Sequence, residues 1–138
     1  VVAAPGHTRD STAFLLAQDG MLLSGDTVLG VGTTVVAHPD GTLGAYLDSI
    51  RRFRELVATG VVHTILPGHG PVVTDPGAVL DFYLSHREER LEQVRRAVAG
   101  GASNAREVVE TVYAGEDPIL WGAAELSVRA QLDYLSKN

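Results

Sequence analysis

Three short apolar runs, each followed by glycine and by a residue that can bind a metal, constrain this chain of 138 residues more than any other feature. The runs span residues 1–4, 21–23 and 61–66. Apolar runs of this length that stop at Gly or Pro are typical of buried strands. His7, Asp26 and His69 follow the three runs closely, so we expect each of them on a tight loop at the end of a core strand.

These three side chains suit a metal site. Two imidazoles and a carboxylate are good ligands for zinc or a similar first-row metal. Because His7, Asp26 and His69 are far apart in the sequence, only the fold of the chain, and not the geometry of one helix, can bring them together. Taken singly, each motif also fits an ordinary turn, since Pro-Gly is common turn chemistry and a histidine beside it can simply be solvated.

Three stretches around these residues read PGHTRDS at 5–11, LSGDT at 23–27 and ILPGHGP at 65–71. In this order they resemble the second half of a metallo-β-lactamase-fold hydrolase. More narrowly, the chain is similar to the β-lactamase-like protein 2 group, whose members carry a small helical, winged-helix-like domain at the C-terminus. The resemblance covers nearly all of the chain. It implies an α/β fold: the second half of an αββα metallo-β-lactamase sandwich, followed by that small helical domain.

One signature of this superfamily is missing. The run His-x-His-x-Asp-His, which supplies most of the metal ligands in the first half of such enzymes, does not occur here. The five histidines are His7, His38, His63, His69 and His86, all far apart. The chain also starts at Val1 rather than at Met. We therefore expect a fragment that lacks the N-terminal half of the site and is inactive on its own.

The resemblance implies two divalent metals bridged by Asp26, because one carboxylate has two oxygens and offsets the charge of both cations. His7 then completes the histidine set at the first metal, and His69 binds the second. Zinc is the first expectation, with manganese and iron as alternatives, and the implied chemistry is hydrolysis by a metal-bound hydroxide. Thr8 and Thr27 stand next to ligands and are candidates for supporting the site, with a plain turn role as the alternative.

The resemblance leaves the substrate open. Enzymes with this fold cleave lactams, esters, thioesters and RNA, and a fold alone does not choose among them. We expect a small molecule or single-stranded RNA as substrate, the N-terminal half of the same protein as a partner, and a homodimer as a further arrangement. The competing hypothesis is a non-catalytic interaction module with a helix-turn-helix-like C-terminus, in which His7, Asp26 and His69 are turn residues.

The charge balance restricts the partners. Lys and Arg total 11 against 17 Asp and Glu, a formal net charge of −6, whereas a dedicated nucleic-acid coat protein is normally basic. A nuclease remains open, because its metals supply local positive charge. Cysteine is absent, which leaves a histidine and carboxylate site as the available kind of metal site. No apolar run approaches the ~18–20 residues that cross a bilayer, so a cytoplasmic protein is expected.

The strands and loops outside these motifs follow from turn residues. An Asp-Gly turn between two apolar runs predicts a hairpin formed by residues 12–17 and 21–24. The apolar run at 61–66 predicts a further strand. Residues 28–37 are apolar but interrupted by Gly30 and Gly32, and we interpret them as a mobile loop.

Four helices are predicted from capping residues and helical periodicity. They begin after Thr42, Asp75, Ser103 or Asn104, and Asp117. The first stops at Gly60, the second runs to Gly100, and Leu120 is placed on the inner face of the last. The middle of the second helix, residues 86–90, is charged, as in helices that join two packed units. We therefore expect two domains: residues 1–90, the metallo-β-lactamase half, and residues 91–138, the helical domain.

Overall fold

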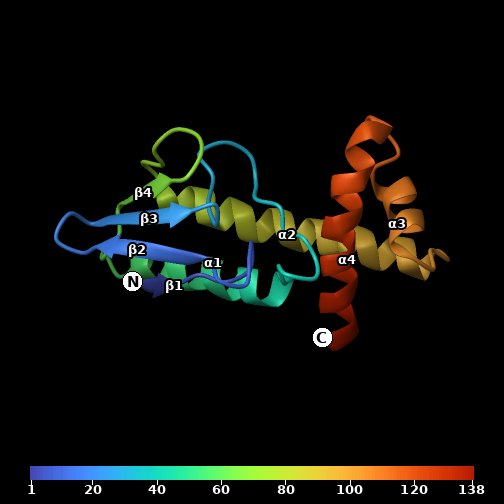
Figure 1. The fold of residues 1–138 in the computed structure, drawn as a ribbon, viewed down its shortest axis with the longest axis horizontal. Helices are drawn as coiled ribbons and strands as arrows, with labels where there is room; N and C mark the ends of the chain where they lie inside the picture. Colours follow the sequence, from blue (N-terminus) through green and yellow to red (C-terminus); the bar gives the residue numbers. More distant parts are fainter.

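A computed structural model describes all 138 residues, with the strands gathered at one end of the molecule and two of the helices at the other (Figure 1). The elements are β1 (Val2–Ala3), β2 (Thr12–Leu16), β3 (Met21–Gly25), α1 (Leu43–Ala58), β4 (Thr64–Pro67), α2 (Pro76–Ala99), α3 (Ala105–Val112), the 3₁₀ turn η1 (Pro118–Leu120) and α4 (Trp121–Lys137). The sheet order is β1-β2-β3-β4. β2 runs antiparallel to both of its neighbours, and β4 is parallel to β3.

The predicted hairpin is confirmed. β2 and β3 pair with Phe14 opposite Leu23, and Gly20 ends the turn between them with a φ of 65°, a conformation that favours glycine. The strand predicted at 61–66 begins later, at Thr64. The first residues of the predicted strand do not join the sheet. Instead, the amides of Val61 and Val62 donate to the Leu56 carbonyl at the end of α1.

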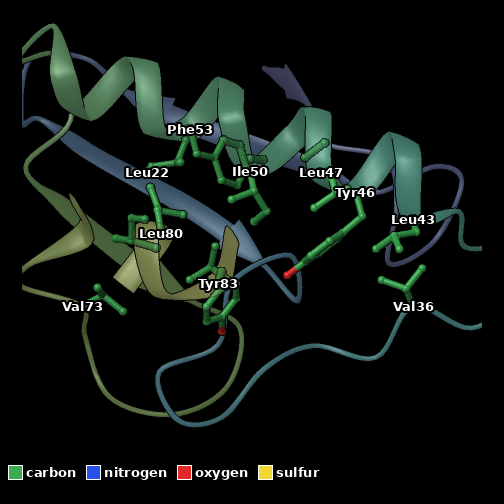
Figure 2. Close-up of a cluster of buried hydrophobic side chains, with 14 of the residues drawn as sticks. Leu22, Val36, Leu43, Tyr46, Leu47, Ile50, Phe53, Val73, Leu80 and Tyr83 are labelled. Atoms are coloured by element: carbon green, nitrogen blue, oxygen red, sulfur yellow. The ribbon is translucent and has the colours of Figure 1, made fainter. Parts of the chain in front are cut away.

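The core lies between the sheet and the helices α1 and α2. The buried apolar side chains of α1 lie along one helical face, as an amphipathic helix requires: Leu43, Tyr46, Leu47, Ile50 and Phe53. Figure 2 shows this row facing Leu22 of β3, and Leu80 and Tyr83 of α2. α1 begins after Thr42 as predicted, although the Thr42 side chain makes no capping hydrogen bond.

The other face of the sheet is not covered by these helices. Successive side chains of a strand point to opposite faces. In β2, Ala13 is fully buried in the core, whereas the alternate residues Phe14 and Leu16 are 51% and 43% exposed. The sheet therefore presents apolar side chains outward.

The helical end has its own small core. Val94 and Ala97 of α2 pack with Val108 and Val109 of α3 and Val128 of α4. α2 also contributes Leu80, Tyr83 and Leu91 to the larger core beside the sheet, so this 24-residue helix belongs to both.

The predicted caps are confirmed for α2 and α3. The Asp75 side chain accepts from the Ala78 amide at 3.3 Å. At α3, Asn104 accepts from the Glu107 amide at 3.0 Å, and the Glu107 carboxylate accepts from the Ser103 amide at 2.7 Å. The Ser103 amide and hydroxyl together lower the pKa of Glu107. These paired bonds resemble a capping box, except that Glu107 accepts from the amide of Ser103, the residue before the N-cap Asn104.

The prediction for Leu120 is wrong. Leu120 is 55% exposed, because the chain after Asp117 first forms the turn η1 and α4 begins only at Trp121. All elements after Pro67 are helical, so the winged-helix detail and the domain division at residue 90 stay predictions. No helix of the structure has the combination of length and hydropathy that a membrane span needs.

Candidate metal centre

The topology brings the three predicted ligands to one end of the sheet. β1, β3 and β4 all run in the same direction, since each neighbour of β2 is antiparallel to it and β4 is parallel to β3. Their carboxyl ends therefore lie together. His7 follows β1, Asp26 follows β3 directly, and His69 follows β4.

Asp26 lies between the two histidines. Its Oδ1 atom is 2.7 Å from Nδ1 of His69, and its Oδ2 atom is 3.8 Å from Nε2 of His7. Each oxygen of one carboxylate thus faces a different imidazole. The structure brings the three side chains together as the sequence predicts, and their role as metal ligands stays a prediction.

The ring of His7 is held in a form that suits metal binding. Its Nδ1 atom is 2.7 Å from the carbonyl oxygen of Val35, and a carbonyl can only accept, so Nδ1 carries the hydrogen. In the neutral ring the lone pair is then on Nε2, the atom that faces Asp26. Metal-binding histidines usually donate their other N–H to a carbonyl or carboxylate in this way.

The spacing of His7 and Asp26 is close to what one shared metal requires. Two ligands bound at about 2.1 Å in tetrahedral geometry lie about 3.4 Å apart, and the observed separation of the two atoms is 3.8 Å.

His69 is 77% exposed and its Nδ1–H donates to Asp26, which leaves Nε2 free. No group of three or more His, Cys, Asp or Glu side chains has the geometry to hold a metal on its own.

Two glycines make this arrangement possible. A Cβ atom at Gly68 would lie 2.8 Å from Oδ1 of Asp26, and one at Gly6 would lie 2.3 Å from Cα of Tyr46. Both contacts are closer than real Cβ atoms allow. The glycine before each histidine is therefore needed for close approach of the chain, in addition to its usual role in turns.

The two threonines next to ligands have different surroundings. The Thr8 hydroxyl interacts with Asp10 Oδ1 at 2.9 Å and with Ser11 Oγ at 2.7 Å, within its own loop. Thr27 is buried, and its carbonyl accepts from the Tyr46 hydroxyl at 2.9 Å. Thr8 thus shapes the turn after His7, and Thr27 fastens the turn after Asp26 to α1.

The loop of residues 28–37 is irregular as predicted, but it is anchored to the helices. The Leu29 amide donates to the Tyr83 hydroxyl at 3.0 Å, and that hydroxyl donates to the Gly32 carbonyl at 2.9 Å. Burial raises the pKa of Tyr83 and of Tyr46, which keeps both hydroxyls protonated as donors.

The sequence did not predict the roles of Arg87 and Thr34. Arg87 donates to the Thr34 carbonyl, and the Thr34 hydroxyl donates to the Asp26 carbonyl. A signal for Arg87 was present: it occupies the apolar stripe of α2 at the spacing set by Tyr83 and Leu91. A charged residue on such a stripe is buried with the stripe. Thr34 lies in an irregular loop, where no periodicity indicates which side chains are buried.

Comparison with known proteins finds homologues along the whole chain. Over its whole length the chain is 33% identical to the Beta-lactamase-like protein 2 homolog of Drosophila melanogaster and 32% identical to that of Caenorhabditis elegans. It superposes on the crystal structure of a beta-lactamase domain protein from Burkholderia ambifaria with a TM-score of 0.85, at 27% identity and over 99% of this chain. The chain is homologous to the C-terminal part of metallo-β-lactamase-family proteins.

The metallo-β-lactamase relatives are much longer than this chain. It spans 45% and 44% of the two curated relatives and 41% of the Burkholderia protein. No protein-family model matches the chain. The α/β fold predicted from the sequence is confirmed, and it matches that of metallo-β-lactamase-fold neighbours.

Proposed function

We propose that this chain provides the C-terminal half of the active site of a metal-dependent hydrolase. The observation that carries the proposal is the position of Asp26, whose two carboxylate oxygens each face one imidazole at the end of the sheet. The donor set of two histidines and one carboxylate suits zinc, with manganese or iron as alternatives. Divalent cations held there supply Lewis acidity, which makes water nucleophilic near neutral pH.

Each residue has a distinct task in this proposal. Asp26 would hold the cations with its two carboxylate oxygens and would offset part of their charge. His7 offers Nε2, with its ring orientation fixed by the Val35 carbonyl. His69 offers a ring nitrogen from an exposed loop whose backbone carbonyl accepts from the Gly30 amide at 2.9 Å.

Three ligands do not complete a site for two metals, because each metal takes about three or four protein ligands. We propose that the others come from the N-terminal half of the same protein. The outward apolar face with Phe14 and Leu16 is the surface against which a second sheet would pack. On its own the 138-residue chain would then be inactive and prone to associate through this face.

The proposed substrate is a small molecule with a lactam, ester or thioester bond, or single-stranded RNA. The site does not distinguish among these by itself, since hydrolysis of each uses the same nucleophile. The net charge of −6 on these 138 residues gives no general attraction for RNA, so local positive charge from the metals would favour RNA binding at this site.

The test is metal content and hydrolysis of the full-length protein. We expect two divalent metals per chain, metal-dependent turnover of at least one of the four substrate classes, and loss of most turnover and of metal in Asp26→Ala. Asp19→Ala is the matched control, because Asp19 lies in the β2–β3 turn, away from the site. A wild-type protein without bound metal, or an Asp26→Ala variant with two metals and normal turnover, would favour the alternative of an interaction module.

A further inference from the structure

Arg87 is a buried cation without a carboxylate partner. It is 6% exposed and takes part in none of the ion pairs of the chain, whereas nearly all other arginines pair with Asp or Glu. Its guanidinium lies over the ring of Tyr46, with Cζ 4.9 Å from the ring centroid, and its Nε atom is buried with no hydrogen-bond partner. Burial of such a charge is costly, so its position requires a reason.

The hydrogen bonds of Arg87 lead to Asp26. Nη2 of Arg87 donates to the carbonyl of Thr34, and the Thr34 hydroxyl donates to the carbonyl of Asp26. Tyr46, which lies under the guanidinium, donates to the carbonyl of Thr27 at 2.9 Å. Arg87 and its two neighbours therefore hold two consecutive peptide units at the end of β3.

The same segment also orients His7. Val35, directly after Thr34, accepts the Nδ1–H of His7 with its carbonyl at 2.7 Å. The segment of Thr34 and Val35 thus contacts both members of the pair that faces one metal position. Arg87 is the side chain that fastens this segment to α2.

We infer that Arg87 is a positioning residue for the metal centre, which sets the distance between His7 and Asp26 through Thr34 and Val35. Arginine suits this task because its planar guanidinium can stack on Tyr46 while an edge N–H reaches a carbonyl. A lysine ammonium is a point charge and cannot do both in the same way. The inference rests on the proposed function, since it concerns the affinity of the same site for metal.

The test uses full-length protein with Arg87→Met, Arg87→Lys and the control Arg96→Met. Arg96 lies on the same helix, is exposed and pairs with Glu92. Zinc affinity is measured by competition with a chelator, and the visible absorption of the cobalt-substituted protein reports the ligand geometry. We expect Arg87→Met to weaken binding of one metal by about 10–100-fold, the usual effect of losing an outer partner of a ligand, and to change the cobalt spectrum. Arg87→Lys should restore little of it, and Arg96→Met should match the wild type.

A second variant keeps the test decisive if Arg87→Met does not fold. Thr34→Val removes the hydroxyl that donates to Asp26 but keeps the shape of the side chain and the carbonyl that Arg87 contacts. We expect it to weaken the same metal position several-fold, with affinities compared well below the thermal midpoint of each variant. The inference is overturned if the wild type binds two metals and both Arg87→Met and Thr34→Val bind them with wild-type affinity. If Arg87→Met is unfolded, wild-type affinity in Thr34→Val alone overturns it. Either result leaves the proposed function intact. Absence of metal from the wild type overturns both.

Discussion

The two sides of the Asp26 carboxylate are built differently. On the side of His7, the ring is oriented by the Val35 carbonyl, and the neighbouring Thr34 is tied to a buried arginine. On the side of His69, the ring is 77% exposed and contacts Asp26 itself, while its backbone is joined to the loop at Gly30. Under the proposed function, this difference means that the metal position beside His7 would be organised by the core, whereas the position beside His69 would depend mainly on its ligands.

Removal of each histidine tests this comparison most strongly. In the full-length protein, His7→Ala should empty the organised position and lower metal affinity by more than the ~10–100-fold that loss of an outer partner causes. His69→Ala should lower affinity less, because a solvent molecule can replace a ligand in an exposed position. Zinc stoichiometry and chelator competition measure both effects. Equal losses in the two variants would contradict the comparison.

A methyl group at Gly68 should disturb both sides together. Its Cβ would meet Oδ1 of Asp26 at 2.8 Å, so the carboxylate has to move away from His69. We expect Gly68→Ala to lower metal affinity by about 10–100-fold, like the loss of an outer partner. Gly122→Ala is the control, because a Cβ at Gly122 meets nothing within 4 Å. Chelator competition on both variants makes the measurement, and normal affinity in Gly68→Ala would show that Asp26 has room to adjust.

The smallest expected effect concerns Tyr46. Tyr46→Phe removes the donor to the Thr27 carbonyl and leaves that buried acceptor unpaired, which costs about 1–3 kcal/mol of unfolding free energy. Tyr134→Phe is the control, since the Tyr134 hydroxyl makes no hydrogen bond within the chain, and it should change stability by less than about 0.5 kcal/mol. Urea unfolding of the full-length protein measures both. Equal stability of the two variants would mean that water satisfies the Thr27 carbonyl.

The convergence of His7, Asp26 and His69 was predictable, because each follows an apolar run closed by glycine and such runs become core strands. The hairpin and the caps at Asp75 and Asn104 were predictable for a similar reason, since short-range turn and cap chemistry fixes them.

The support beneath the site was harder to predict. From the sequence, Arg87 falls in the charged stretch 86–90 of a helix that joins two packed units, although its spacing from Leu91 puts it on the buried stripe. The start of β4 was misplaced because Val61 and Val62 close α1 before the strand begins. Both errors arise because these residues bond to another segment, Arg87 to the Thr34 carbonyl and the Val61 and Val62 amides to the Leu56 carbonyl. The local pattern of one segment does not reveal such bonds.

Helix α2 gives the site a thermodynamic connection to the far end of the chain. It contributes Leu80 and Leu91 to the core beside the sheet, and Val94 and Ala97 to the core of the helical end. Helical segments form cooperatively, so fraying of the helical end spreads along α2 toward Arg87. Amide exchange at Leu29, whose amide donates to the Tyr83 hydroxyl of α2 at 3.0 Å, should then follow the stability of the helical end, although Tyr83 lies about three helical turns from Val94.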